Sequence, residues 1–418
     1  MHNDDSGNGK ILRKSLLTAS LVTGSRLCAF LATLAAVNFY GSAEFGAISV
    51  AQQISLYAVM IASLGMDKLA VRLIAGSPNR VGEIATTVIS WRMIVGVPVY
   101  LLVLLATWAI PALNSILTLV AVFGITIFTQ GVTVLWVPQA VQRPLVHGAT
   151  LLVTQALFFV FLKIGIHFER GPWVVPGALV LAQSITAVGL LAWMKLRVGP
   201  LRRPLGLVKS REFLKTAIPF GTSNILRGLA ASSDLILLGV LLGKSAEVGW
   251  YSGASRLYLF GHGLLTVYFV VLYPILARRA AEGRAQLGSE VKRSLIRTVP
   301  IAAFGLGIFV WFAGDVLLLL FPDDFIGAKD SLRFLLLALF ASTLAGQFGH
   351  SLMAMNFQIV DMRNTLIAAV VHVTTKVILI GQFGIVGAAI GCLAGEATLL
   401  VLGASTFALA LKKVPSNE

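Results

Sequence analysis

The chain has 418 residues, of which 57% are hydrophobic and only 12% are charged. Its mean hydropathy is +0.87, and soluble globular proteins carry about 25% charged residues, so the composition excludes a soluble protein and predicts an all-α membrane protein with many spans. The net charge of +15 would favour a nucleic-acid partner in a soluble protein, but its distribution along this chain argues against one.

Apolar runs long enough to cross a bilayer as helices, which takes about 20 residues, recur along the whole chain. We expect about twelve spans, at residues 15–38, 44–65, 86–109, 115–137, 148–166, 174–194, 217–241, 248–275, 298–321, 331–355, 364–382 and 386–411. The basic segment 195–216 divides them into two sets of six. The expected organisation is an N-terminal tail 1–14, a six-helix bundle 15–194, a linker 195–216, a second six-helix bundle 217–411 and a C-terminal tail 412–418.

Lysine and arginine are distributed unevenly between the two sets of connections. One set, which includes both tails and the linker, holds 23 of the 33 basic residues, and the opposite set holds 4. Basic residues concentrate in cytoplasmic loops, so we expect both termini to be cytoplasmic. The high net charge is then a topology signal, and it can also attract anionic lipid headgroups at the linker.

The two halves of the chain share a short sequence pattern at equivalent positions. Residues 42–51 and 245–254 match at six positions with a constant offset of 203 residues, and both follow an expected span. Internal duplication is typical of transporters that hold their substrate between two repeats. The pattern therefore predicts two pseudo-symmetric bundles.

Several charged residues lie within the expected spans, where a charge costs at least ~2.5–3.5 kcal/mol. Arg26 and Arg227 lie near the middle of the first and seventh spans, and a guanidinium binds phosphate through two parallel hydrogen bonds. We expect these arginines to line a central cationic lumen and to bind substrate. The further candidate lining residues are Arg256, Asn224 and Gln53.

Acidic and titratable groups within the spans are candidates for gating or ion coupling. Asp234 and Arg256 lie at matching depths in consecutive antiparallel spans, so we expect them to pair. Glu396 and His372 lie mid-span and could carry a proton or bind a cation. We expect the charges nearer the span ends to reach the interface by snorkelling: Arg92, Arg333 and Lys376. Structural ion pairs between helices are the alternative for all these groups.

No catalytic, metal-binding or nucleotide-binding motif occurs in the sequence. Its two cysteines, Cys28 and Cys392, lie in apolar spans, which indicates packing rather than a disulfide or a metal ligand. We therefore expect a non-enzymatic protein without a bound cofactor. The energy that drives any transport would come from an H⁺ or Na⁺ gradient, the membrane potential or the substrate gradient.

Four segments carry a family pattern: Asn224 to Leu242, Val248 to Ser252, Glu44 to Gly46 and Phe383 to Ala389. They resemble the polysaccharide-exporter branch of the multidrug/oligosaccharidyl-lipid/polysaccharide (MOP) exporter superfamily. The resemblance in layout covers essentially residues 10–413. It implies a V-shaped fold like that of the multidrug exporters (MATE), with two six-helix bundles and alternating access.

The resemblance also implies a function, which is to flip an oligosaccharide on polyprenyl pyrophosphate across the bacterial inner membrane. The product would be a surface polysaccharide such as O-antigen, capsule or exopolysaccharide, and a polysaccharide polymerase and chain-length proteins are candidate partners. Three alternatives stay open. They are a cation-coupled drug exporter of the same fold, a membrane polymerase or ligase, and a scaffold in a polysaccharide assembly complex. The short outer loops argue against an enzyme.

Overall fold

A computed structural model describes residues 4–168 and 171–412, and nearly all of them are helical, with no strand in these two ranges. The prediction of an all-α membrane protein is therefore confirmed. Contacts divide the chain into two compact units, Met1–Ile225 (unit 1) and Leu226–Glu418 (unit 2). The division falls within a single helix, α10 (Leu207–Ser232).

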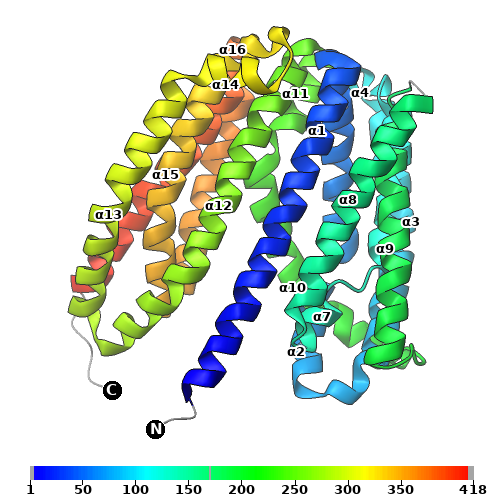
Figure 1. Cartoon of the computed structure of the whole chain (residues 1–418), viewed down its shortest axis with the longest axis vertical. Coiled ribbons are helices and arrows are strands. Elements are labelled where there is room, and N and C mark those ends of the chain that lie inside the picture. Colours follow the sequence, from blue (N-terminus) through cyan, green and yellow to red (C-terminus); the bar gives the residue numbers. More distant parts are fainter. Residues whose placement is uncertain (1–3, 169–170, 413–418) are drawn as a thin grey trace. The chain divides into compact units, whose positions relative to one another are not determined.

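Helices up to α10 build unit 1 (Figure 1). They are α1 (Asp4–Ser63), α2 (Met66–Gly76), the 3₁₀ turn η1 (Pro78–Arg80), α3 (Val81–Ala109), α4 (Pro111–Asn114), α5 (Leu117–Gly124), α6 (Thr126–Val132), α7 (Val137–Ala140), α8 (Pro144–Phe168) and α9 (Val174–Arg197). Unit 2 contains α11 (Asp234–Leu242), α12 (Ala246–Glu282), α13 (Arg284–Trp311), α14 (Ala313–Leu320), η2 (Asp323–Ala328), α15 (Lys329–Ala354) and α16 (Gln358–Lys412).

Eight helices within the described residues are long and apolar enough to cross a membrane. Two of them, α1 and α16, are interrupted at Gly41 (φ 72°) and Gly384 (φ 54°). Their ψ angles are 176° and −131°, and only glycine adopts these φ/ψ combinations without strain. Each glycine therefore divides its helix into two of the expected spans. The expected spans 217–241 and 248–275 correspond to α10 with α11 and to α12.

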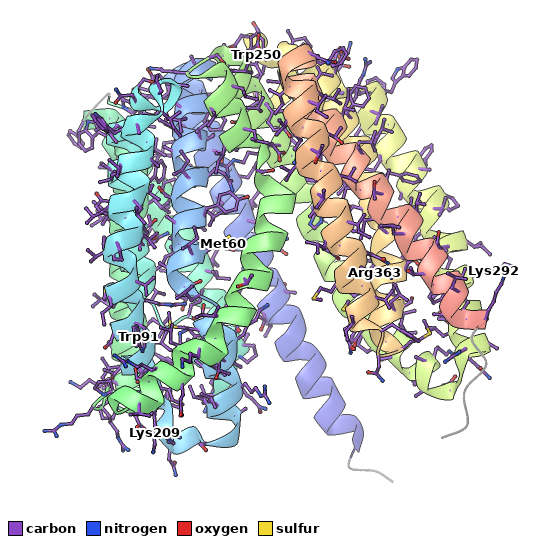
Figure 2. All side chains as sticks on the ribbon, turned by 180° about the vertical axis from the view of Figure 1, so that it is seen from behind. Met60, Trp91, Lys209, Trp250, Lys292 and Arg363 are labelled. Atoms are coloured by element: carbon purple, nitrogen blue, oxygen red, sulfur yellow. The ribbon has the colours of Figure 1, made fainter. Side chains whose placement is uncertain are left out.

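The basic segment 195–216, predicted as a linker, packs onto unit 1. The Leu205 backbone N–H donates to the Thr87 hydroxyl at 2.9 Å, and the Trp91 indole N–H donates to the Ser210 hydroxyl at 2.5 Å. Figure 2 shows Trp91 and Lys209 at the same end of this unit. The segment therefore closes one end of the unit 1 core.

Arg92 of α3 does not snorkel, which corrects the expectation from its position near a span end. The residue is 6% exposed. Its Nη2 pairs with Asp67 at 2.5 Å, and its Nη1 donates to the Gln130 carbonyl at 3.4 Å. Asp67 belongs to α2, which lies between the expected spans 44–65 and 86–109. The half-exposed carboxylate of Asp67 on this amphipathic helix therefore neutralises the buried arginine.

In unit 2, α12, α13 and α16 pack around α15 (Figure 1). A buried apolar cluster that includes Phe269, Leu276 and Phe407 fills the end of the unit near the α12–α13 turn. Figure 2 shows Trp250 at the opposite end from Lys292 and Arg363. Between these ends, unit 2 buries a group of charged and polar side chains.

Candidate functional site

The carboxylate of Asp234 lies at the break between α10 and α11. Helix α10 ends at Ser232, and α11 begins at Asp234, whose charge favours the N-terminal end of a helix. Asp234 is only 7% exposed. Both of its oxygens are occupied, because Lys376 Nζ donates to Oδ1 and the Tyr251 hydroxyl donates to Oδ2 at 2.5 Å.

Both partners of Asp234 are completely buried. Lys376 and Tyr251 each have 0% exposure, and they come from α16 and α12. A buried lysine without a counter-ion would lose its hydration without compensation, whereas this ammonium lies on a carboxylate that a phenol also stabilises. The arrangement is thus a buried ion pair with one neutral hydrogen bond, held by three helices of one unit.

A helical hairpin in α16 brings Lys376 into this position. Gly387, Gly391 and Gly395 occur four residues apart, and they lie directly against the preceding arm of the same hairpin. A Cβ added to Gly391 would overlap Lys376, and one added to Gly395 would overlap the His372 ring. The absence of side chains at these glycines therefore lets the two arms approach closely and leaves room for the lysine and the histidine.

Two further polar residues near the ion pair, His372 and Glu396, each have one atom without a partner among the described residues. His372, one turn before Lys376, is 5% exposed, and its Nδ1 has no hydrogen-bond partner among the described residues. Glu396 Oε1 accepts from the Tyr258 hydroxyl at 3.5 Å, while no described residue pairs with its Oε2. Buried polar atoms are nearly always satisfied, so these two atoms leave hydrogen-bonding capacity unused inside unit 2.

We call Asp234, Tyr251, Tyr258, His372, Lys376 and Glu396 the inner polar cluster. It joins α11, α12 and both arms of α16, all within unit 2. Charge in such a group can be redistributed by moving one proton or by separating Lys376 from Asp234. Either change would alter which helices attract one another, and this is the chemistry that gating or coupling requires.

The structure brings together three of the predicted residues: Asp234, His372 and Glu396. It contradicts the expected Asp234–Arg256 pair, because the salt bridge of Asp234 is with Lys376. Lys376 does not snorkel, which corrects that prediction as well. Tyr251 was not predicted as a partner of Asp234. For Lys376 the sequence did hold two signals: its i, i+4 spacing from His372 and the four-residue spacing of Gly387, Gly391 and Gly395.

The other predicted residues are not part of this cluster. Arg26 and Gln53 belong to α1 in unit 1, and Arg256 lies on α12, half-buried. The side chains of Asn224 and Arg227 lie outside the described residues. The central lumen that was expected to join these five residues therefore stays a prediction.

Comparison with known proteins adds a family and a fold. A family model described as "Polysaccharide biosynthesis protein" matches residues 11–279. No curated protein matches the sequence significantly.

Several solved structures share the fold. A lipid II flippase, MurJ, in an inward closed conformation has a TM-score of 0.73 at 13% identity, covering 96% of this chain and 88% of its own. An inward-facing multidrug resistance MATE family transporter of the MOP superfamily has a TM-score of 0.68 at 17% identity, covering 96% of both chains. A MOP superfamily transporter from Pyrococcus furiosus reaches 0.58 at 16% identity over 96% and 95% of the chains. The fold is therefore that of the MOP transporters.

Proposed function

The chain belongs to the polysaccharide biosynthesis protein family, and on this premise we propose that it flips a lipid-linked glycan precursor across the membrane. The substrate class is an oligosaccharide on polyprenyl pyrophosphate, and the product feeds surface polysaccharide such as O-antigen, capsule or exopolysaccharide. The observation that carries the proposal is the buried Asp234–Lys376 pair inside a fold that a lipid II flippase shares. A protein that only anchored a complex would have no use for a cluster so costly to bury.

The proposed mechanism is alternating access without covalent chemistry. Arg26, Arg227 and Arg256, with Asn224 and Gln53, would contact the pyrophosphate and the sugars. Asp234, His372 and Glu396 would gate or couple, with Lys376 as the internal counter-ion of Asp234. The energy source would be an H⁺ or Na⁺ gradient or the substrate gradient, and no bound cofactor is required.

The proposed location is the bacterial inner membrane with both termini cytoplasmic. The support is the excess of lysine and arginine in one set of connections. In this orientation the glycan is loaded from the cytoplasmic leaflet, where its pyrophosphate lies. A polysaccharide polymerase and chain-length proteins would then use it on the other side.

A cation-coupled exporter of small molecules is the second candidate. It is favoured by the likeness to multidrug transporters and by the unpaired Glu396 Oε2 among the described residues. However, the ammonium of Lys376 already neutralises Asp234, which leaves one carboxylate fewer for an external cation. Dye efflux driven by an ion gradient, with normal surface polysaccharide in a deletion strain, would favour this second candidate.

Deletion of the gene should abolish the surface polysaccharide and leave its lipid-linked unit on the cytoplasmic side. Complementation with Arg227→Ala should restore less than about a tenth of the wild-type output, because a charge-assisted hydrogen bond to phosphate is worth ~1.5–3 kcal/mol. Surface polysaccharide is measured at matched protein level. Arg333→Ala, whose side chain is 38% exposed and pairs with Asp330, should complement fully. Wild-type output from Arg227→Ala would remove that residue from the mechanism.

A further inference from the structure

Helix α13 gives unit 2 an exposed apolar face. Only 6% of the 18-residue apolar window of this helix is buried, the smallest share among the eight candidate spans of the described residues. Its exposed side chains include Ile301 and Phe304, each 74% exposed, and Trp311, which is 77% exposed. Large exposed apolar patches mark interaction surfaces, and in a membrane-spanning helix such a surface lies against lipid. This face of α13 therefore contacts the hydrocarbon chains of the bilayer.

A groove lies on this face where α13 packs beside α15. Its volume is about 200 Å³, and it is lined by apolar residues, which include Ala303, Gly307 and Val310 of α13 and Leu336, Leu337 and Phe340 of α15. Gly307 opens the groove, because a Cβ added there would meet no atom within 4 Å. Ala303 and Val310 lie ~10 Å apart along the helix axis. The groove can therefore hold part of one acyl chain.

Three basic residues of α13, Lys292, Arg293 and Arg297, lie beyond one end of the groove. Arg297 precedes Ala303 by six residues, which is ~9 Å along the axis, and Figure 2 shows Lys292 at the end of unit 2. Steps of three or four residues lead from Arg293 to Gly307, so these two residues share one face of the helix. One leaflet contributes ~15 Å of the hydrocarbon core, so a lipid held at the arginines reaches the groove.

The positive charges at this end of α13 are largely uncompensated. Lys292 and Arg297 are exposed, and neither forms an ion pair or a hydrogen bond with another described residue. Arg293 lies 4.0 Å from Glu290, whose carboxylate is also 3.6 Å from a second arginine. The neighbouring helix α15 has no acidic residue after its first turn. Like charges four residues apart repel one another on a helix, so an anion between Arg293 and Arg297 would relieve this repulsion.

We propose that this face of α13 binds one anionic phospholipid from the leaflet that borders the α12–α13 turn. The phosphate lies between Arg293 and Arg297 within reach of Lys292, and one acyl chain lies in the groove at Gly307. A phospholipid supplies the anion and the hydrocarbon chain together, and basic sites beside membrane spans bind anionic headgroups. The site is separate from the inner polar cluster and does not depend on which substrate the protein transports.

Native mass spectrometry of the full-length protein tests the site, with phosphatidylglycerol and phosphatidylcholine of identical chains as probes. Wild type should bind one phosphatidylglycerol at least about tenfold more tightly than phosphatidylcholine. Lys292→Gln and Arg297→Gln should each weaken phosphatidylglycerol binding about fivefold, equivalent to ~1 kcal/mol, and leave phosphatidylcholine binding unchanged. Gly307→Leu should weaken both lipids, by about fourfold for each methylene group that can no longer enter the groove.

Two control variants should bind both lipids like wild type. Arg278→Gln removes a basic residue from α12, at the same end of unit 2, whose side chain is 73% exposed. Gly305→Leu adds the same side chain as Gly307→Leu at a position ~200° away around α13, where a Cβ would also meet no atom within 4 Å. The two charge variants lie at exposed positions, so they decide the proposal even if Gly307→Leu does not fold.

Three results would overturn the proposal. The first is equal binding of the two lipids by wild type, and the second is equal phosphatidylglycerol binding by Arg297→Gln and Arg278→Gln. The third is tighter binding of a polyprenyl phosphate than of phosphatidylglycerol, lost in Gly307→Leu, which would assign the groove to a polyprenyl lipid instead. Because no glycan is present, these results are independent of the flippase function.

Discussion

Replacing Lys376 by methionine should lower the free energy of unfolding by about 3–5 kcal/mol. The substitution keeps the volume of the side chain but leaves the carboxylate of Asp234 with only the Tyr251 hydroxyl as a partner. Both residues are buried, so the remaining charge cannot recover hydration. Thermal or denaturant unfolding of the purified protein in one detergent, followed by tryptophan fluorescence, measures the loss.

Two companion variants decide whether the loss comes from the ion pair. Lys292→Met, at an exposed position of α13 labelled in Figure 2, should change stability by less than about 0.5 kcal/mol. The double variant Asp234→Asn/Lys376→Met should recover most of the loss, because no buried charge remains and the amide oxygen still accepts from Tyr251. If Lys376→Met behaved like Lys292→Met, the ion pair would not stabilise unit 2.

The hairpin of α16 gives a second large effect. Replacing glycine by alanine should change the free energy of unfolding differently at two positions of this helix. Gly391→Ala should lower the free energy of unfolding by about 1–3 kcal/mol. The new methyl group would overlap the side chain of Lys376 and contact its backbone too closely. Gly381→Ala, on the same helix, would meet no atom within 4 Å. There alanine should be neutral or stabilise by up to ~1 kcal/mol, through its higher helix propensity.

Unfolding of the two glycine variants under identical conditions makes this comparison, and surface polysaccharide output reports the effect on function. Gly391→Ala should also reduce output, since it displaces the ammonium from Asp234. A stabilising effect at both positions would show that the two arms of α16 do not pack as closely as the structure places them.

The spans could be predicted from the sequence because each depends on a local property, the length of an apolar run. The reversal in α16 was likewise visible, since Gly384 follows one run and precedes another. The partner of Asp234 depends instead on how α12 is rotated about its axis. Tyr251 and Arg256 are five residues apart, which separates them by about 140° around a helix of 3.6 residues per turn. A helix that presents Tyr251 to Asp234 therefore directs Arg256 elsewhere.

Depth along a helix was also a poor guide to whether a basic residue is buried. Arg92 and Lys376 lie near expected span ends, a position that favours snorkelling, yet both are buried against carboxylates. Asp67 comes from a segment between expected spans, and Asp234 lies 142 residues from Lys376. Tertiary packing determines which buried charges pair, and that packing cannot be read from a single sequence.

Transport by the purified protein tests the central claim most directly. Vesicles carrying a polyprenyl-pyrophosphate-linked oligosaccharide would contain wild-type protein, the double variant Asp234→Asn/Lys376→Met or no protein, and glycan reaching the opposite leaflet would be followed with an impermeant lectin or glycosidase. The account predicts rapid transfer by wild type and transfer at the protein-free rate by the folded double variant. Equal rates in all three preparations would contradict it.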